Sequence, residues 1–238
     1  MFRKSVAYIV VAVVICFSSL SLANDKPIQR TVRSYDIIAD GEDVGDLTVT
    51  RRRGQNQTDL IILSNTKVML SGFMWSWNMS LDSRYEFSEG VIKSFDHKLV
   101  EDGKTSRVSG GRLGDFIQTK NGKNGFVTID TASFDATLEG VVNYVMNSSS
   151  VALGTEIQML DTVELTIRPY TVMGLDQQAM TIGGIEYACR LVKMKTPEGY
   201  STYLLAEDDL GAFLVKESGA DEDGPYEIRM KESREHSQ

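Results

Sequence analysis

The sequence predicts a mainly β fold in which one curled antiparallel sheet, a half-barrel, wraps around one amphipathic helix. Most of the chain alternates apolar and polar residues in short runs broken by Gly, Asn and Asp, which is typical of antiparallel strands with one buried face. The spacing of apolar residues becomes helical only once, after Ser133. A sheet of so many strands is expected to curl, and a helix in its concave face would bury the apolar sides of both elements.

The chain begins with the pattern of a signal peptide. Arg3 and Lys4 precede an apolar run over residues 6–20, and small residues follow it up to Ala23. We expect residues 1–23 to be a signal peptide that is cleaved after Ala23, with no transmembrane span left in the mature protein. The protein is then exported and is periplasmic or secreted. The alternative is an uncleaved membrane anchor, because the apolar run is nearly long enough to span a bilayer.

A single domain is expected over residues 24–231, and its first part has the pattern of a meander of antiparallel hairpins. The clearest strand covers residues 73–81, where Phe73, Trp75 and Trp77 share one face because strand side chains alternate with a period of two. Tight hairpin turns are indicated by Gly after Asp, Glu or Asn at 40–41, 89–90, 102–103 and 121–122. The expected strands are residues 34–39, 46–52, 60–70, 73–81, 91–100, 105–113, 116–120 and 126–130.

The one amphipathic helix is expected next. Ser133 is a suitable N-cap, and Asp135 would lie near the positive end of the helix dipole. The polar residues 147–150 would end the helix. The apolar residues at helical spacing are Phe134, Leu138, Val141, Val142 and Val145.

The alternating pattern then resumes and predicts the strands that complete the sheet. Nothing after the helix marks a second domain, since there is no repeat of solenoid period and no low-complexity linker. Residues 232–238 are expected to be a disordered tail. The expected strands are residues 155–166, 179–182, 186–195, 200–205, 212–217 and 226–231.

Several segments occur in a characteristic order along the chain. They are Tyr35-Asp36-Ile37 with Val44-Gly45, then Phe134-Asp135, then residues 181–188 (TIGGIEYA) and residues 203–216 (YLLAEDDLGAFLVK). In this order they resemble exported domain-of-unknown-function proteins that adopt a half-barrel fold like that of the lipoprotein carriers. The resemblance implies the same half-barrel here and implies no catalytic residues.

The residues that could carry chemistry are few. The chain has two histidines, and we expect His97 to be structural or at the surface rather than catalytic, while His236 lies in the expected tail. Cys189 is the one cysteine left after cleavage, and it reads as a small apolar strand residue rather than a reactive thiol. No cofactor and no metal site is therefore expected.

Charged clusters are interpreted as surface features. The acidic loops 207–209 and 221–223 are expected to be solvated hairpin turns, with calcium binding as the less favoured reading. Residues 51–53, all Arg, are expected to protect an exposed strand end, with binding of an anionic headgroup or glycan as the alternative. The net charge of −8 disfavours nucleic acid as a partner.

Three functional hypotheses follow. The first is a non-enzymatic envelope protein that binds or carries a lipid or other apolar ligand in the half-barrel. The aromatic residues Phe73, Trp75 and Trp77 would then line the ligand cavity, although they would serve equally as packed core. The second is an interaction or assembly factor with a solid core, which uses a sheet edge or an acidic face on another envelope protein. The third and least favoured is a hydrolase or lyase built on carboxylates such as Asp96, Asp115 or Asp130. The ligand-binding residues of the first hypothesis are Phe73, Trp75, Trp77, Phe134, Leu138 and Val142.

Overall fold

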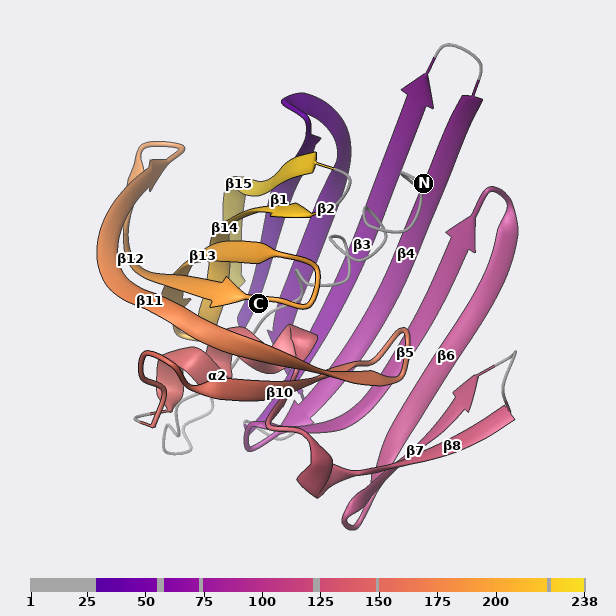
Figure 1. Cartoon of the computed structure of the whole chain (residues 1–238). Coiled ribbons are helices and arrows are strands. Elements are labelled where there is room, and N and C mark those ends of the chain that lie inside the picture. Colours follow the sequence, from indigo (N-terminus) through magenta and orange to yellow (C-terminus); the bar gives the residue numbers. More distant parts are fainter. Residues whose placement is uncertain are drawn as a thin grey trace.

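The computed structural model describes residues 29–54, 58–72, 75–121, 125–148, 150–221 and 224–237, and the predicted signal peptide lies outside these ranges. The described residues form a 15-stranded sheet in the order β8-β7-β6-β5-β4-β3-β2-β1-β15-β14-β13-β12-β11-β10-β9. Neighbouring strands are antiparallel except for β9, which pairs parallel to β10. The sheet is curled and open, as Figure 1 shows. The predicted mainly β, curled sheet is confirmed.

The first half of the sheet agrees closely with the expected meander. Its hairpin turns have positive φ at the expected positions, for example at Asp40 and Gly41. The strands are generally longer than expected, because their exposed ends lack a clear apolar alternation. They are β1 (Gln29–Ala39), β2 (Glu42–Arg53), β3 (Asp59–Gly72), β4 (Trp75–Ser88), β5 (Val91–Glu101), β6 (Lys104–Leu113), β7 (Phe116–Asn121) and β8 (Gly125–Asp130).

The second half contains one strand more than expected, namely β9 (Ala136–Thr137), which lies in the segment predicted to begin the helix. The segment 155–166 does not form a single strand, because the Asp161 carboxylate accepts hydrogen bonds from the backbone N–H groups of Val163 and Glu164 and turns the chain. Leu165 completes this turn with a φ of 58°. The strands are β9 (Ala136–Thr137), β10 (Glu156–Asp161), β11 (Thr166–Ile182), β12 (Ile185–Lys195), β13 (Tyr200–Asp208), β14 (Gly211–Asp221) and β15 (Gly224–Ser237).

The prediction of a long amphipathic helix wrapped by the sheet is wrong. The described residues contain one short α-helix, α2 (Val141–Asn147), preceded by the 3-10 turns η1 (Thr131–Ser133) and η2 (Leu138–Gly140). Phe134 is extended, and the Asp135 backbone N–H donates to the Gln158 carbonyl at 2.8 Å. The Asp135 carboxylate also accepts from the Gln158 N–H at 2.7 Å. Pairing with β10 therefore replaces the first turns of the expected helix.

The concave side of the sheet is filled by the end of the β13–β14 hairpin together with α2. Pairing of β14 with β15 stops at Lys216 and Arg229, and the rest of β14 leaves the sheet. Residues on both faces of this hairpin end are buried, whereas an ordinary surface hairpin buries one face. The buried residues are Leu204, Leu205, Ala206, Ala212, Phe213, Leu214 and Val215. We call residues 204–215 the plug hairpin.

The C-terminal segment also differs from the prediction. β15 continues to Ser237 and pairs with β1 from Ser34–Glu232 to Gln29–Ser237, so the expected disordered tail from Glu232 belongs to the sheet up to Ser237. The two ends of the described chain therefore meet in the middle of the sheet. Among the described residues, no helix has the length and apolar character that crossing a membrane requires.

Candidate functional site

The predicted ligand-binding residues whose side chains the structure describes lie in the hydrophobic core or against it. Phe73 and the side chain of Trp75 lie outside the described residues. Trp77 is fully buried, and its Nε1 donates to Glu101 Oε1 at 3.0 Å. Figure 1 places the start of β4, which carries Trp77, at the end of the sheet remote from α2. Leu138 and Val142 are buried and Phe134 is partly buried, so the described members of the set are core residues.

An ion-pair network that the sequence analysis missed holds the plug hairpin. Asp208 accepts hydrogen bonds from both Arg33 and Arg51, which are 2% and 1% exposed. Arg51 also donates to the carbonyls of Leu210 and Gly211. The Arg33 guanidinium carbon lies 3.6 Å from the centre of the Phe213 ring, a cation–π contact.

Two interpretations are corrected by this network. The acidic loop 207–209 is not simply a solvated turn, because Asp208 points into the molecule and is 14% exposed. Arg51 does not protect an exposed strand end, since its side chain is buried against the plug hairpin. Burial lowers the pKa of the neighbouring Arg53, which donates to the Asp209 carbonyl at 2.8 Å. In the sequence, continuous apolar runs on both sides of this loop indicate strands that are buried on two faces, and this pattern could have predicted that the loop points inward.

His97 is buried and joins three segments. Its Nδ1 lies 3.0 Å from Ser83 Oγ and its Nε2 lies 3.0 Å from Thr162 Oγ1. Burial lowers the pKa of His97 to about 3, so the imidazole is neutral at physiological pH. Ser83, His97 and Thr162 are at most 5% exposed, so this polar cluster lies inside the protein. The arrangement ties β4 and β5 to the β10–β11 turn.

Glu217 on β14 is a buried carboxyl group among tyrosines. Tyr226 Oη lies 3.0 Å from Glu217 Oε1 and donates to it, and it also lies 2.7 Å from Ser201 Oγ. Glu217 Oε2 has no hydrogen-bond partner among the described residues. Burial raises the pKa of Glu217 to about 7 and raises the pKa values of Tyr203 and Tyr226. Glu217 is therefore a buried acid that titrates near neutral pH.

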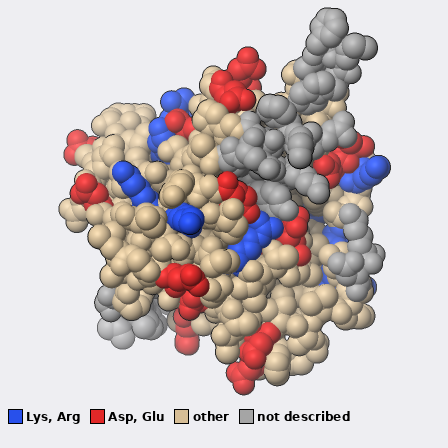
Figure 2. Space-filling model, viewed as in Figure 1, with Lys and Arg blue, Asp and Glu red and all other residues tan. Residues whose placement is uncertain are grey.

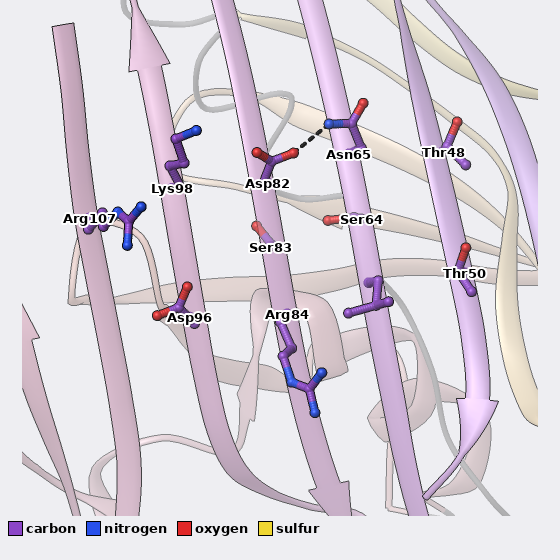
Figure 3. A pocket seen from close by; sticks show the side chains of 11 residues that line it. Thr48, Thr50, Ser64, Asn65, Asp82, Ser83, Arg84, Asp96, Lys98 and Arg107 are labelled. Atoms are coloured by element: carbon purple, nitrogen blue, oxygen red, sulfur yellow. Dashed lines mark hydrogen bonds between the residues drawn. The ribbon is translucent and has the colours of Figure 1, made fainter.

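The convex face of the sheet holds a polar hollow of about 420 Å³ over β2 to β6 (Figure 3). One row of directly paired residues crosses it: Thr48, Asn65, Asp82, Lys98 and Arg107. Arg84 and Asp96 form part of the next row. Each carboxylate here lies directly opposite a cation on the neighbouring strand, Asp82 opposite Lys98 and Asp96 opposite Arg84, so the hollow has no surplus of negative charge. Figure 2 likewise shows acidic and basic side chains interspersed on the face that it views.

A larger groove, of about 820 Å³, lies between α2 and the β11–β12 hairpin. Arg190 fixes one wall, because its Nη1 donates to the Val145 carbonyl near the end of α2 at 2.8 Å. Burial raises the pKa of the Cys189 thiol, which favours the unreactive protonated form. The groove has an apolar part and a polar part. Its lining residues are Met146, Leu175, Asp176, Gln177, Gln178, Ala179, Ala188, Cys189 and Arg190.

The carboxylates of the hydrolase hypothesis lie in two places. Asp96 lines the polar hollow. Asp130 ends β8, and its Oδ1 accepts from the Ala132 N–H at 2.9 Å, so it caps η1. The Asp115 carbonyl accepts from the Thr131 N–H at 2.9 Å, which places the β6–β7 turn beside the end of β8. Among the described residues, no group of three or more His, Cys, Asp or Glu is arranged to hold a metal ion.

Comparison with known proteins identifies a family and a fold. The family model described as "Domain of unknown function (DUF6134)" matches residues 35–212. No curated protein sequence matches the chain. The crystal structure of a beta-barrel-like protein of domain of unknown function DUF1849 from Brucella abortus is similar, with a TM-score of 0.63 and 10% sequence identity. The similarity covers 89% of this chain and 99% of that chain, and at this identity it shows the fold alone.

Proposed function

The chain belongs to the DUF6134 family, and from that premise we propose that it is an exported, non-enzymatic protein that binds an amphiphilic ligand in the groove between α2 and the β11–β12 hairpin. The groove carries this proposal. Its volume of about 820 Å³ is within the range of sites for small organic ligands. An envelope protein of this kind would act as a carrier or as a sensor of its ligand.

The lining of the groove is suited to a molecule with two chemical parts. Met146, Leu175 and the directly paired Ala179 and Ala188 offer apolar contact to an acyl chain or ring. Asp176, Gln177, Gln178 and Arg190 offer hydrogen bonds and one cation to a polar head group. An amphiphile can contact both parts of the lining, whereas a purely polar ligand would leave the apolar side chains exposed to water.

The groove supports this function better than the interior of the sheet. The plug hairpin and α2 fill the concave side, and the interior aromatic residue Trp77 is fully buried. A ligand in the interior would have to displace the plug hairpin and break its contacts to Arg33 and Arg51. The carrier-like order of segments and the signal-peptide pattern in the sequence are further support for an exported carrier.

The test is native mass spectrometry of the protein purified from its own cells, followed by extraction of whatever is bound. We expect a chain that starts at Asn24, as export predicts, with an amphiphile bound at a fixed ratio. Ala179→Trp should abolish this binding by filling the groove, and it should fold because Ala179 is exposed. Ile167→Trp is the matched control, since Ile167 lies on the same strand outside the groove lining.

The outcomes separate the alternatives. A molecule that still binds to the Ala179→Trp variant would show that the ligand lies elsewhere, which would contradict the proposed site. A bare chain mass in both variants and in the wild-type protein would contradict ligand binding and favour an interaction role with a solid core.

A further inference from the structure

The edge of the sheet at β8 is a second surface with features of a binding site. β8 ends the sheet on one side, and β7 is its neighbour. β9 ends the sheet on the other side, but its residues Ala136 and Thr137 are 7% and 3% exposed. β8 is therefore the edge strand that a partner can reach.

The backbone of β8 is available for pairing. Within the described part of the chain, no backbone hydrogen bond joins residues 126–129 to an element other than β7. In an antiparallel edge strand, alternate residues point their N–H and C=O groups away from the neighbouring strand. Edge strands are usually protected by Lys, Pro or a bulge. β8 (GFVTID) has no Lys and no Pro, and its register with β7 continues from Gly125 to Asp130 without a bulge.

Exposed apolar side chains accompany this edge. Phe126 is 82% exposed, Phe116 is 48% exposed and Leu113 is 64% exposed. Leu113 and Phe116 are direct partners on β6 and β7. On the outer face, Phe126 of β8 thus offers an apolar contact to a side chain of an added strand, and Phe116 and Leu113 extend the exposed apolar surface across β7 and β6.

The charges at the two ends of β8 are opposite in sign. Asp130 and Asp115 lie at one end, where the Thr131 N–H donates to the Asp115 carbonyl at 2.9 Å. Lys120 lies at the other end, directly opposite Phe126. All three charged residues are exposed. A strand that binds here would be oriented by a cation near Asp130 and an anion near Lys120.

We propose that β8 binds an extended segment of a partner protein, which adds to the sheet as an antiparallel strand. The segment has apolar residues at alternate positions, a basic residue at its N-terminal end next to Asp130, and an acidic residue at its C-terminal end next to Lys120. Main-chain hydrogen bonds would provide affinity and the alternate side chains would provide specificity. This surface is distinct from the groove of the proposed function.

An extended peptide fits this edge better than a second copy of the chain. Stable interfaces between globular proteins bury about 1,200–2,000 Å² in total. One six-residue edge strand, on which Phe126 is the exposed large apolar side chain, offers a smaller surface. A peptide strand can bind to a surface of this size, because all of its residues can lie against β8.

The test uses a synthetic peptide in which Val alternates with Thr, with Lys at the N-terminus and Glu at the C-terminus. Binding to the full mature chain is measured by fluorescence anisotropy, and the bound site is located by hydrogen exchange. We expect saturable binding and slower exchange of the amides of residues 126–129. Phe126→Lys and Thr128→Lys should each weaken binding by about tenfold or more, because a lysine protects an edge. Both residues are exposed, so both variants should fold.

The controls define what would overturn the proposal. Met69→Lys changes a side chain that is 68% exposed on β3 and should leave binding unchanged. A peptide with Lys and Glu exchanged should bind more weakly. Absence of saturable binding, protection outside β8, or binding that tolerates Phe126→Lys would each overturn the proposal. A concentration-dependent dimer of the chain alone that Phe126→Lys abolishes would also overturn it, in favour of a second copy.

Discussion

At the scale of single residues, the interior contains polar groups that would be costly to bury without partners. His97 is neutral and has a hydroxyl group beside each ring nitrogen. Glu217 has the Tyr226 hydroxyl beside Oε1, while Oε2 has no partner among the described residues. Both groups therefore make stability depend on pH, in opposite directions: His97, whose pKa burial lowers from 6.5 to about 3, favours folding as the pH rises between these values, whereas Glu217 disfavours folding as the pH rises from 4.5 to about 7.

The contribution of Glu217 to stability should fall as the pH rises towards neutrality. Burial raises its pKa from an ordinary 4.5 to about 7, so between these pH values the unfolded chain releases a proton from this group that the folded chain keeps. The contribution of Glu217 to the free energy of unfolding then decreases from pH 4.5 to pH 7 and stays lower above pH 7, by on the order of 3 kcal/mol. The buried Tyr203 and Tyr226 stay neutral throughout this range, since burial raises their pKa values.

Urea unfolding of Glu217→Gln across this pH range measures the effect. The variant keeps an oxygen acceptor for Tyr226 and cannot ionise, so its stability relative to that of the wild-type protein should increase from pH 4.5 to pH 8. Glu42→Gln is the control, because Glu42 is exposed. Parallel pH profiles for Glu217→Gln and the wild-type protein would show that Glu217 does not titrate in this range.

At the scale of elements, the plug hairpin and the short helix α2 together fill the side of the sheet that one longer amphipathic helix was expected to fill. The fixed points of the plug hairpin are polar: Asp208 with Arg33 and Arg51, and the Leu214 carbonyl, which accepts from Tyr35 Oη at 2.9 Å. These contacts join β1 and β2 to β13 and β14, which lie far apart in the sequence. The hairpin therefore couples the two halves of the sheet.

Asp208→Asn should destabilise the protein by about 3–5 kcal/mol, because it removes the carboxylate that accepts hydrogen bonds from two buried guanidinium groups. Chemical denaturation measures the change. Glu207→Gln is the matched control, since the adjacent Glu207 is exposed, and it should change stability by less than about 0.5 kcal/mol. Equal effects of the two substitutions would show that the ion pairs do not hold the hairpin.

At the scale of the whole molecule, the first and last strands of the sheet in sequence, β1 and β15, lie side by side in its middle. β1 pairs with β15 along its whole length, and all the other strands, β2 to β14, lie between these two in the sequence. Such pairing of distant segments is cooperative, because neither terminal strand has its full set of partners until both are in place.

A chain that ends at Lys231 should therefore lose stability, by at least about 2 kcal/mol. Residues 29–34 of β1 would lose their partners in β15, including the buried Thr31 and Arg33. Thermal unfolding measures the loss. The full-length variant with Arg234→Ala and Glu235→Ala keeps the strand backbone and should stay close to the wild-type protein. An unchanged melting temperature for the truncated chain would mean that the segment does not contribute to the sheet.

Much of the fold could be predicted because it depends on local chemistry. The alternation of side chains in Trp77 to Leu81 and the Asp-Gly turns at 40–41 and 102–103 act within a few residues, and the structure has strands and positive φ values there. The candidate site was less predictable. Aromatic residues on one strand face look the same whether they line a cavity or pack in a core, and Trp77 is in the core.

The amino-acid sequence is enough to predict that the chain forms many hairpins with one buried face, because the alternation and the turn residues involve near neighbours. What fills the sheet and where its edges lie depend on tertiary contacts. The segment after Ser133 is not helical at first, because Asp135 pairs with Gln158. The acidic loop at Asp208 points into the molecule, where Asp208 forms ion pairs with Arg33 and Arg51. These contacts join residues distant in sequence, so their energy depends on the folded arrangement and leaves no local pattern.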